Sequence, residues 1–479
     1  MVEKSRTTYV CPLGSRYAKK MGYIFSDEFK HRRWRKCWHA LAESQYELGI
    51  GGVTKKQVDQ MKSHLLDINY TVAEAIEKEK RHDVMAYLLA YAQQCPDAAP
   101  IMHLGATSCL VADNTELMQM HAAKNMIKRK LVNTISNVRD FSIKYKDLPI
   151  LGFTHFQPAQ PTTLGKRAAT WCQDLVLDYR EICNLEELTM LRGAKGTTGT
   201  QASYFELADG DEKKVKELNQ KFVEKLGYKT DFPITTQTYP RKYDSIALNV
   251  LAGIGESAHK AGLDIRLLQN RREMEESFGK DQVGSSTMMY KRNPMKSERM
   301  CGLSREVIAN SIKPRMTEMT QILERSLDDS SPRRIYIPES FMAADEVLNL
   351  YMNIMEEPVV YPKVIARNLN EMMPFIATEN ILMAAVKRGG NRQELHEIMR
   401  QHSQEASRRI KKEGKSNELL EMLAKDPKIG MTLEEIKSTI DVKEYIGRAP
   451  QLTEDYMKEV KELLDYEESL LGLKSKVEV

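Results

Sequence analysis

Residues 284–299 read GSSTMMYKRNPMKSER and combine hydroxyl groups with positive charge. The stretch has neither the alternation of a strand nor the apolar spacing of a helix, and Gly284 and Pro294 favour a loop. Its basic side chains are Lys291, Arg292, Lys296 and Arg299. Two interpretations are open: the loop binds an anion and acts on it, or it is an ordinary polar surface loop.

His155 lies in the segment THFQPAQPTT, among polar side chains and just before a predicted long helix. The prolines of this segment predict a rigid, extended backbone. Histidine side chains often act as acids or bases because imidazole generally titrates near neutral pH. A positioned acid or base and a plain polar loop histidine both fit this setting.

Two further segments, RHDVMA and HLGATS, carry groups that suit an anion. They contribute Arg81, His82, Asp83, Thr107 and Ser108. Backbone N–H groups that precede a helix can face a phosphate. The spacing GxxxxGK[ST] of a P-loop is missing, so the use of ATP is not indicated. The alternative is a surface cluster of salt bridges.

The segment ERSLDDSSPRR adds a second group of donors, which are Arg325, Ser330, Arg333 and Arg334. Guanidinium groups bind carboxylates and phosphates through paired hydrogen bonds, so a second anion pocket is one interpretation. A charged connection between helices is the other. Because these donor-rich loops all lie between predicted long helices, they suggest one shared site.

Helical periodicity dominates the elements that must position these loops. Apolar residues recur at helical spacing, and the predicted long helices are 114–145, 162–190, 243–278 and 339–356. Segment 297–325 is also predicted to be helical, with a kink at Pro314. Thirty residues of helix span about 45 Å and rarely stand alone, so a central bundle is predicted.

The regions before and after the bundle look different, with shorter amphipathic pieces and more loops. We therefore predict an N-terminal helical domain (1–110), a central long-helix bundle with the loop described above (111–362) and a C-terminal helical domain (363–479). In FKHRRWRKCWHAL, the aromatic residues stand among arginines, as on some nucleic-acid surfaces. Trp34 and Trp38 have helical spacing, however, which predicts a buried stripe.

Composition narrows the class of protein. The 479 residues have a net charge of +4, which does not indicate a dedicated nucleic-acid binder. The seven cysteines form no CxxC pair, so neither a disulfide framework nor a zinc ribbon is indicated. No apolar run is long enough to cross a membrane, and the N-terminus lacks the apolar core of a signal peptide. A soluble cytoplasmic protein is expected.

Together these segments resemble a known family. GSSTMMYKRN is similar to the GSSxMxxKxN signature of the fumarase/aspartase superfamily, and THFQPAQPTT and HLGATS match its other two shared regions in order. Within that superfamily the chain resembles the adenylosuccinate lyases, especially the animal-type enzymes, from about residue 9 to the C-terminus. The stretches that carry this resemblance are SRY, RHDVMA, LGATSC, LGFTHFQPAQ, KGTTGTQAS, YKRNPMKSER and RSLDDSSPRR.

The resemblance implies an all-α, three-domain fumarase/aspartase-like fold with a central long-helix bundle. It implies a β-elimination that releases fumarate from adenylosuccinate, giving AMP, and from the succinylated imidazole carboxamide ribotide (SAICAR), giving AICAR. It also implies a homotetramer whose active sites draw loops from three chains, with no metal and no organic cofactor.

The same resemblance assigns roles to residues. Ser285 matches the family's general base and His155 its general acid, while Lys291 and Asn293 match residues that hold the succinyl carboxylate. Met289 departs from the family, which usually has proline there. The positions that match substrate contacts are Arg16, Tyr17, Arg81, His82, Asp83, Thr107, Ser108, Gln237, Arg299, Arg325, Ser330 and Arg334.

Three alternatives remain at the level of sequence. An argininosuccinate lyase would share the fold and the elimination, but the YKRNP loop and the arginine-rich segment 325–334 suit a nucleotide phosphate better. A structural protein on the same scaffold would not need Ser285 or His155. An RNA-binding helical protein would use the basic loops, but the modest net charge and the lack of an aromatic-basic platform argue against it.

Overall fold

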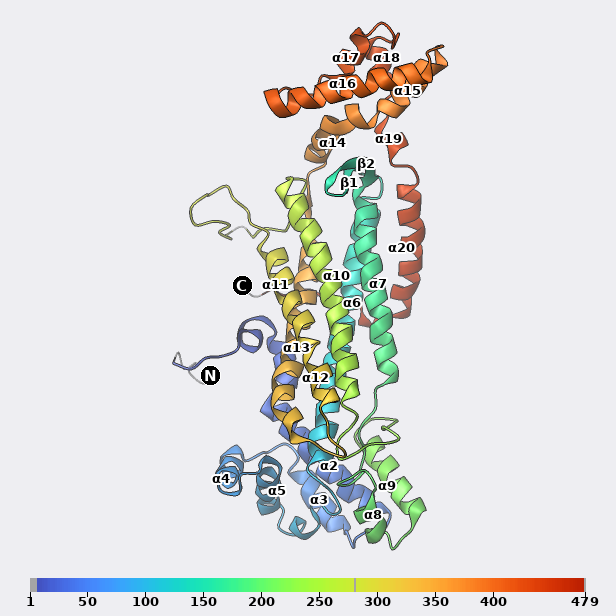
Figure 1. The fold of residues 1–479 in the computed structure, drawn as a ribbon. Coiled ribbons are helices and arrows are strands. Elements are labelled where there is room, and N and C mark those ends of the chain that lie inside the picture. The colour runs from blue at the N-terminus through green and yellow to red at the C-terminus, as the bar shows by residue number, and fades with distance from the viewer. Residues whose placement is uncertain (1–6, 280, 478–479) are drawn as a thin grey trace.

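The computed structural model describes residues 7–279 and 281–477, and long helices form its centre. In Figure 1 these helices run side by side along the length of the molecule. They are α6 (Cys109–Lys144), α7 (Leu164–Glu187), α10 (Lys242–Asn270), α11 (Met295–Asn310) and α13 (Ser330–Glu356). The prediction of an all-α fold around a central long-helix bundle is confirmed.

Each long helix buries the apolar stripe that predicted it. Leu117, Ile127 and Leu131 of α6 are fully buried, and so is Ile254 of α10. Helices α10 and α11 pack closely at Gly262, where an added Cβ would lie 2.7 Å from the sulfur of Cys301. A side chain at position 262 would therefore force these two helices apart.

Several helix ends differ from the sequence prediction: α10 ends at Asn270 rather than at 278, and two further differences occur beside prolines. Helix α13 begins at Ser330 rather than at 339 and continues through Pro338. The predicted helix 297–325 is interrupted: α11 ends at Asn310, and α12 (Lys313–Met319) begins anew with Pro314 in its first turn. Proline lacks the N–H group that a helix interior needs, and the first turn tolerates this loss.

Short helices gather at one end of the bundle, which is the lower end in Figure 1. Helix α2 (Asp27–Glu47) packs against α6 there, and its Trp34, Trp38 and Leu41 are buried, as their spacing predicted. The other helices of this region are α1 (Lys19–Ile24), α3 (Lys55–Ser63), α4 (Tyr70–Lys80), α5 (Asp83–Gln94), α8 (Ala202–Leu207) and α9 (Glu212–Lys225).

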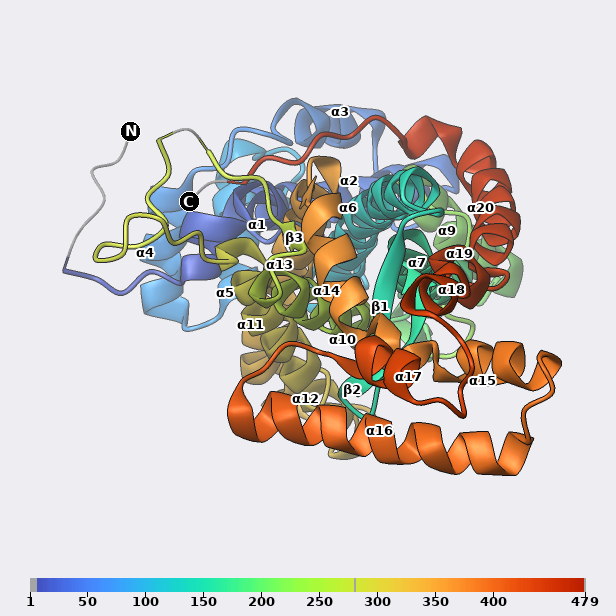
Figure 2. The same ribbon diagram turned by 90° about the horizontal axis from the view of Figure 1, so that it is seen from above.

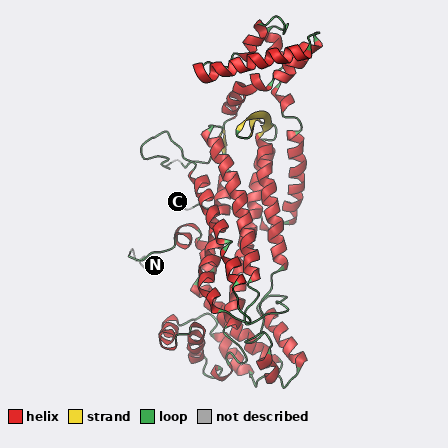
Figure 3. Cartoon of the chain, viewed as in Figure 1, coloured by secondary structure: helices red, strands yellow, loops and turns green. Residues whose placement is uncertain are grey.

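The opposite end carries a β-hairpin and a helical cap. Strands β1 (Pro149–Thr154) and β2 (Gln157–Thr163) pair antiparallel, and Figure 3 shows this small sheet at the end of the bundle. The strands β3 (Met274–Glu275) and β4 (Val359–Val360) form a second pair. The cap consists of α14 (Pro362–Ile376), α15 (Thr378–Lys387), α16 (Arg392–Glu413), α17 (Leu419–Lys425), α18 (Leu433–Ser438) and α19 (Val442–Tyr445).

The cap has a small apolar core of its own, built from residues of α15 to α18, and α16 lies across the end of the bundle (Figure 2). The last long helix, α20 (Ala449–Tyr466), leaves the cap and returns to pack against α6 and α7. Its Met457, Val460 and Leu464 therefore belong to the main core. The division of the chain at residues 110 and 362 stays a prediction.

A search of the described part of the chain found no helix that is both long enough and apolar enough to cross a membrane.

Candidate active site

The residues predicted to contact substrate form two groups within the chain. The larger group lies at the lower end of the bundle, where α5, α6 and α13 begin. We call it the anion cluster, and its members are His82, Asp83, Thr107, Ser108, Gln237, Arg325, Ser330 and Arg334. Three helix N-termini meet there, and the positive end of each helix dipole favours a negatively charged ligand.

Side-chain contacts link the members of the anion cluster. The ring Nε2 of His82 lies 3.4 Å from the hydroxyl of Ser108, and Arg334 donates a hydrogen bond to Asp83 over 3.2 Å. The Gln237 amide donates to the hydroxyl of Thr107 over 3.4 Å. Four segments that are far apart in the sequence are thus brought together in one place.

His82 is also the N-cap of α5, because its Nδ1 accepts a hydrogen bond from the backbone N–H of Met85 over 3.3 Å. This hydrogen bond leaves Nε2 facing Ser108. Arg81, just before it, adopts a left-handed conformation with φ of 54°, which ends α4 and turns the chain into α5. The sharp turn explains why Arg81, His82 and Asp83 are adjacent in sequence but have different surroundings.

A second, smaller group lies beside α13. The guanidinium of Arg299 lies 5.2 Å from the ring centre of Tyr17, and that of Arg16 lies 5.9 Å from it. Arg299 also lies 3.7 Å from a carboxylate oxygen of buried Glu346. Burial raises the pKa of Glu346 to about 6, although its hydrogen bond from Asn349 opposes that shift.

The loop before α11 carries Ser285, Lys291 and Asn293 and extends outward from the bundle in both views (Figures 1 and 2). The hydroxyl oxygen of Ser285 accepts the backbone N–H groups of Thr287 and Met288 over 3.3 and 3.0 Å. Hydrogen bonds donated to an oxygen favour its anionic form, which a serine base requires. The Asn293 amide donates to the carbonyl of Gly284 over 2.7 Å and closes the loop on itself.

Ser285 and Lys291 line a concavity of about 510 Å³ within this loop. Met289, which stands where the family usually has proline, is fully exposed to solvent. No side-chain partner for Lys291 lies among the described residues, so its charge is available to a ligand. The loop thus presents hydroxyl, ammonium and amide groups close together, but it presents them to the outside.

His155 occupies the turn between β1 and β2. The strand register pairs Thr154 with Gln157, so His155 and Phe156 form a two-residue turn, and both have positive φ values of 51° and 60°. Residues other than glycine rarely adopt this conformation, and where they do it often marks a functional site. The imidazole is exposed at the tip of the hairpin.

A single chain does not bring all of these groups together. Thr107 and Ser108 precede α6, whereas His155 follows it, and a helix of 36 residues is about 54 Å long. The anion cluster and the hairpin turn therefore lie at opposite ends of the bundle (Figure 1).

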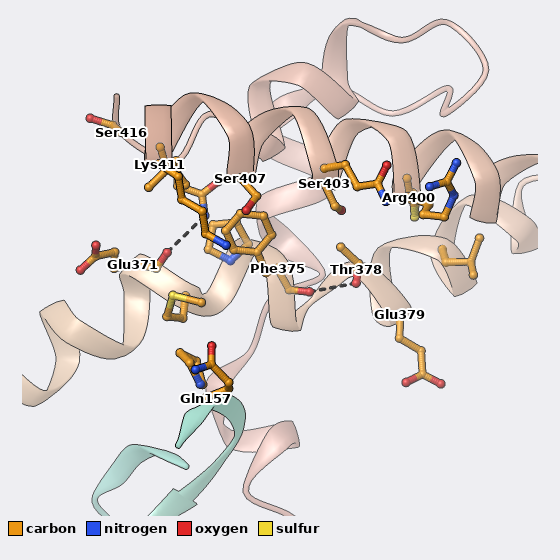
Figure 4. A pocket seen from close by; sticks show the side chains of 18 of the residues that line it. Gln157, Glu371, Phe375, Thr378, Glu379, Arg400, Ser403, Ser407, Lys411 and Ser416 are labelled. Carbon is orange, nitrogen blue, oxygen red and sulfur yellow. Dashed lines mark hydrogen bonds between the residues drawn. The ribbon is translucent and has the colours of Figure 1, made fainter. Parts of the chain in front are cut away.

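A cavity of about 1350 Å³ lies between the cap helices α14 to α16 and the hairpin. Figure 4 shows Phe375, Ser403, Ser407 and Lys411 around it, with Gln157 on the hairpin side. None of the predicted site residues lines this cavity. In residues 7–279 and 281–477, no cluster of histidine, cysteine and acidic side chains could hold a metal ion.

Sequence reasoning missed a group of buried charged residues beneath the anion cluster, of which Arg241 and Asp329 are the central pair. The signal was weak, because Arg241 lies in a polar stretch just before a helix, and in ERSLDDSSPRR only the hydroxyls and cations, not Asp329, pointed to a site. Their partners are distant in sequence, so only the folded chain reveals them.

Comparison with known proteins shows the family to which the chain belongs. The lyase family model matches residues 38–309, and the model for the adenylosuccinate lyase C-terminus matches residues 374–456. Adenylosuccinate lyase of Schizosaccharomyces pombe is 43% identical over 94% of both chains, and that of Saccharomyces cerevisiae is 45% identical over 94% of both. In fold, the chain is similar to 3-carboxy-cis,cis-muconate lactonizing enzyme from Pseudomonas putida, with a TM-score of 0.81, 23% identity and coverage of 94% of this chain and 99% of that one. The chain belongs to the adenylosuccinate lyase family of the fumarase/aspartase superfamily.

Proposed function

We propose that the protein is a carbon–nitrogen lyase that releases fumarate from adenylosuccinate, giving AMP, and from SAICAR, giving AICAR. The observation that carries this proposal is the anion cluster, where three helix N-termini, Arg325 and Arg334 converge on one place. A nucleotide phosphate has the charge and the acceptor oxygens that such a place binds. The near full-length similarity to adenylosuccinate lyases supports the same substrates.

The elimination removes a proton from the carbon next to a carboxylate and then expels a nitrogen. Ser285 takes the proton, and the two backbone N–H groups on its oxygen stabilise the alkoxide that does so. Lys291 and Asn293 hold the carboxylate whose negative charge grows as the proton leaves, which is the step that electrostatic stabilisation accelerates most. His155 gives a proton to the departing amine. No metal ion or organic cofactor takes part.

We further propose that the protein works as a homotetramer with shared active sites. The distance between His155 and the anion cluster supports this, because about 54 Å of helix separates them within one chain. Large apolar side chains are exposed along and after α12, as on surfaces that bind another protein chain. They include Ile312, Met316, Met319, Ile322, Leu323 and Leu327.

We propose the cytoplasm as the location of the protein. All seven cysteines lie in the described part of the chain and none of them forms a disulfide, which fits a reducing compartment. Neither a nucleic acid nor a membrane is expected as a partner.

The test is the release of fumarate, followed by NMR or mass spectrometry, from adenylosuccinate, SAICAR and argininosuccinate in separate reactions. We expect release from the first two alone. Release from argininosuccinate would contradict the assignment of the substrate. A folded protein that releases fumarate from none of the three would favour a structural role.

A further inference from the structure

The buried guanidinium of Arg241 joins carboxylates from two other helices beneath the anion cluster. Its Nε donates a hydrogen bond to Asp329 over 2.7 Å, and its two terminal nitrogens donate to Asp113 over 3.2 and 3.3 Å. All three side chains are almost fully buried. Since buried charges are costly unless they are paired and hydrogen-bonded, these contacts hold the three residues in one arrangement.

Each carboxylate that Arg241 holds is attached to a predicted substrate contact. Asp329 also accepts a hydrogen bond from Arg325 over 3.3 Å, and it directly precedes Ser330 at the start of α13. The guanidinium of Arg325 is therefore oriented by a carboxylate oxygen, Oδ2, that also accepts the hydrogen bond from Arg241. Loss of Arg241 would leave Asp329 free to rotate and Arg325 without a fixed partner.

The second carboxylate fixes the segment that carries Gln237. Asp113 accepts the backbone N–H of Tyr239 over 2.9 Å, two residues after Gln237. The backbone N–H of Gln237 in turn donates to the carbonyl of Glu324 over 3.2 Å, just before Arg325. Arg241 thus connects the start of α6, the segment around Gln237 and the start of α13.

The charges of this region are balanced. Burial alone would raise the pKa of Asp113, but Arg241, Arg333 and Arg192 outweigh that effect, and the pKa of Asp113 lies below its ordinary value. Arg333 is the second buried cation and donates to Asp244 over 2.8 Å, with Glu116 also at 2.8 Å. The Asp113 carboxylate is thus charged, and its place in the arrangement depends on the guanidinium groups around it.

We propose that Arg241 is a positioning residue that sets the geometry of the substrate-binding half of the site, acting through Asp329 on Arg325 and through Asp113 on Gln237. It touches no substrate, because it is buried below the residues that do. The inference rests on the proposed lyase function. Since Ser285 and His155 lie in other parts of the chain, Arg241 governs binding rather than the proton transfers.

The test compares steady-state kinetics of Arg241→Met, Arg241→Lys and Asp329→Asn with adenylosuccinate as substrate. For Arg241→Met we expect KM to rise on the order of ten- to a hundredfold, because small displacements of binding groups have effects of this size, while kcat stays within about threefold. Arg241→Lys keeps the charge but loses the forked geometry, so it should recover part of the loss in KM.

A double variant tests whether the two residues act through one contact. Arg241→Met combined with Asp329→Asn should raise KM by less than the product of the single effects, since both changes break the same link. Glu467→Gln is a matched control. It disturbs another buried ion pair, between Glu467 and Lys128 at 2.8 Å on the α20 side of the bundle, and should leave KM unchanged.

The outcomes separate this inference from the proposed function. A wild-type protein that releases no fumarate contradicts the function. If the wild type is active and the KM values of Arg241→Met and Arg241→Lys stay within about twofold of the wild-type KM, only the positioning role is contradicted. A variant whose kcat falls while its KM is unchanged contradicts the positioning role as well. Circular dichroism confirms that each variant is folded, and if Arg241→Met does not fold, an unchanged KM in Arg241→Lys overturns the proposal.

Discussion

The anion cluster and the outer loop with Ser285 are held in opposite ways. Members of the anion cluster contact one another across four segments, and buried ion pairs lie directly beneath them. The loop instead makes its hydrogen bonds mainly within itself, and its chemical groups face solvent. The hairpin turn with His155 is exposed in the same way.

This difference matches the two proposed roles. The groups proposed to bind the nucleotide are already in place within one chain, whereas the groups proposed to transfer protons lie on its outside, where they can join the active site of another chain. Preorganised binding lowers the cost of ordering the site. Loop closure over a bound substrate excludes water, and catalytic groups on an outer loop suit such a step.

The largest effect is expected for Ser285→Ala. Removal of the proposed base should lower kcat by roughly 10²–10⁴-fold and leave substrate binding nearly unchanged, since the anion cluster is intact. Fumarate release measures the first quantity and isothermal titration of adenylosuccinate the second. Ser286→Ala, one residue away, is the matched control and should remain active. A reversed result, with Ser286→Ala inactive, would assign the base to Ser286.

His155→Asn should abolish most turnover for a different reason, because the leaving amine receives no proton.

Mixing this variant with Ser285→Ala during refolding offers a sharper experiment. If each active site combines His155 from one chain with Ser285 from another, mixed tetramers should regain activity that neither variant has alone. Recovery that never exceeds the sum of the separate preparations would show that both groups serve one chain.

Arg334→Gln tests the binding half. It removes a cation and its 3.2 Å contact with Asp83, and we expect KM to rise about tenfold with little change in kcat, because hydrogen bonds to charged groups are worth about 1.5–3 kcal/mol. Arg408→Gln is the control, since Arg408 is an exposed arginine on α16 that contacts Glu405 and Glu413. An equal rise in KM for both variants would indicate a general charge effect.

The smallest effect is expected on stability, from a residue of the bundle between the anion cluster and the hairpin. Burial, together with the carboxylates of Asp174, Glu256 and Glu181, raises the pKa of Asp178 on α7 from 3.8 to about 7, against a hydrogen bond from Ser257. The folded chain therefore keeps a proton that the unfolded chain loses between about pH 4 and 7, and this contribution to stability falls as the pH rises through that window.

Asp178→Asn should remove the fall in stability that accompanies ionisation of Asp178. We expect the free energy of unfolding at pH 8 to rise by on the order of 1 kcal/mol, with no gain near pH 4 and unchanged catalysis. Melting temperatures at the two pH values measure the effect. Asp140→Asn is the control, because Asp140 on α6 is largely exposed and is not among the groups that raise the pKa of Asp178. A similar gain at both pH values would exclude titration of Asp178 as the cause.

The sequence predicted the long helices well and their ends less well. The stripe of Leu117, Ile127 and Leu131 is a local property, so α6 could be found without the fold. The prediction at Pro314 was wrong, since this proline begins a new helix instead of bending an old one, and α13 was predicted too short, since it begins at Ser330 and continues through Pro338. Packing against neighbouring helices decides which of these a proline does.

The candidate site was predictable to the extent that its motifs are local. The serine loop, the histidine segment and the arginine-rich stretch each stand out by residue type, and their resemblance to one family tied them together. The left-handed turn at His155 and Phe156 could not be predicted, because the surrounding strands impose it. The roles of these residues and the tetramer stay proposals.

The sequence by itself thus determined where the helices lie, which loops carry chemistry and which family the chain resembles, because apolar spacing and residue type are read along the chain. Only the tertiary structure decided that Arg241 binds Asp113 and Asp329, which are 128 and 88 residues away. It also decided that His155 and the anion cluster lie at opposite ends of one helix. Both facts depend on which buried surfaces meet when the bundle packs, and no local pattern contains that information.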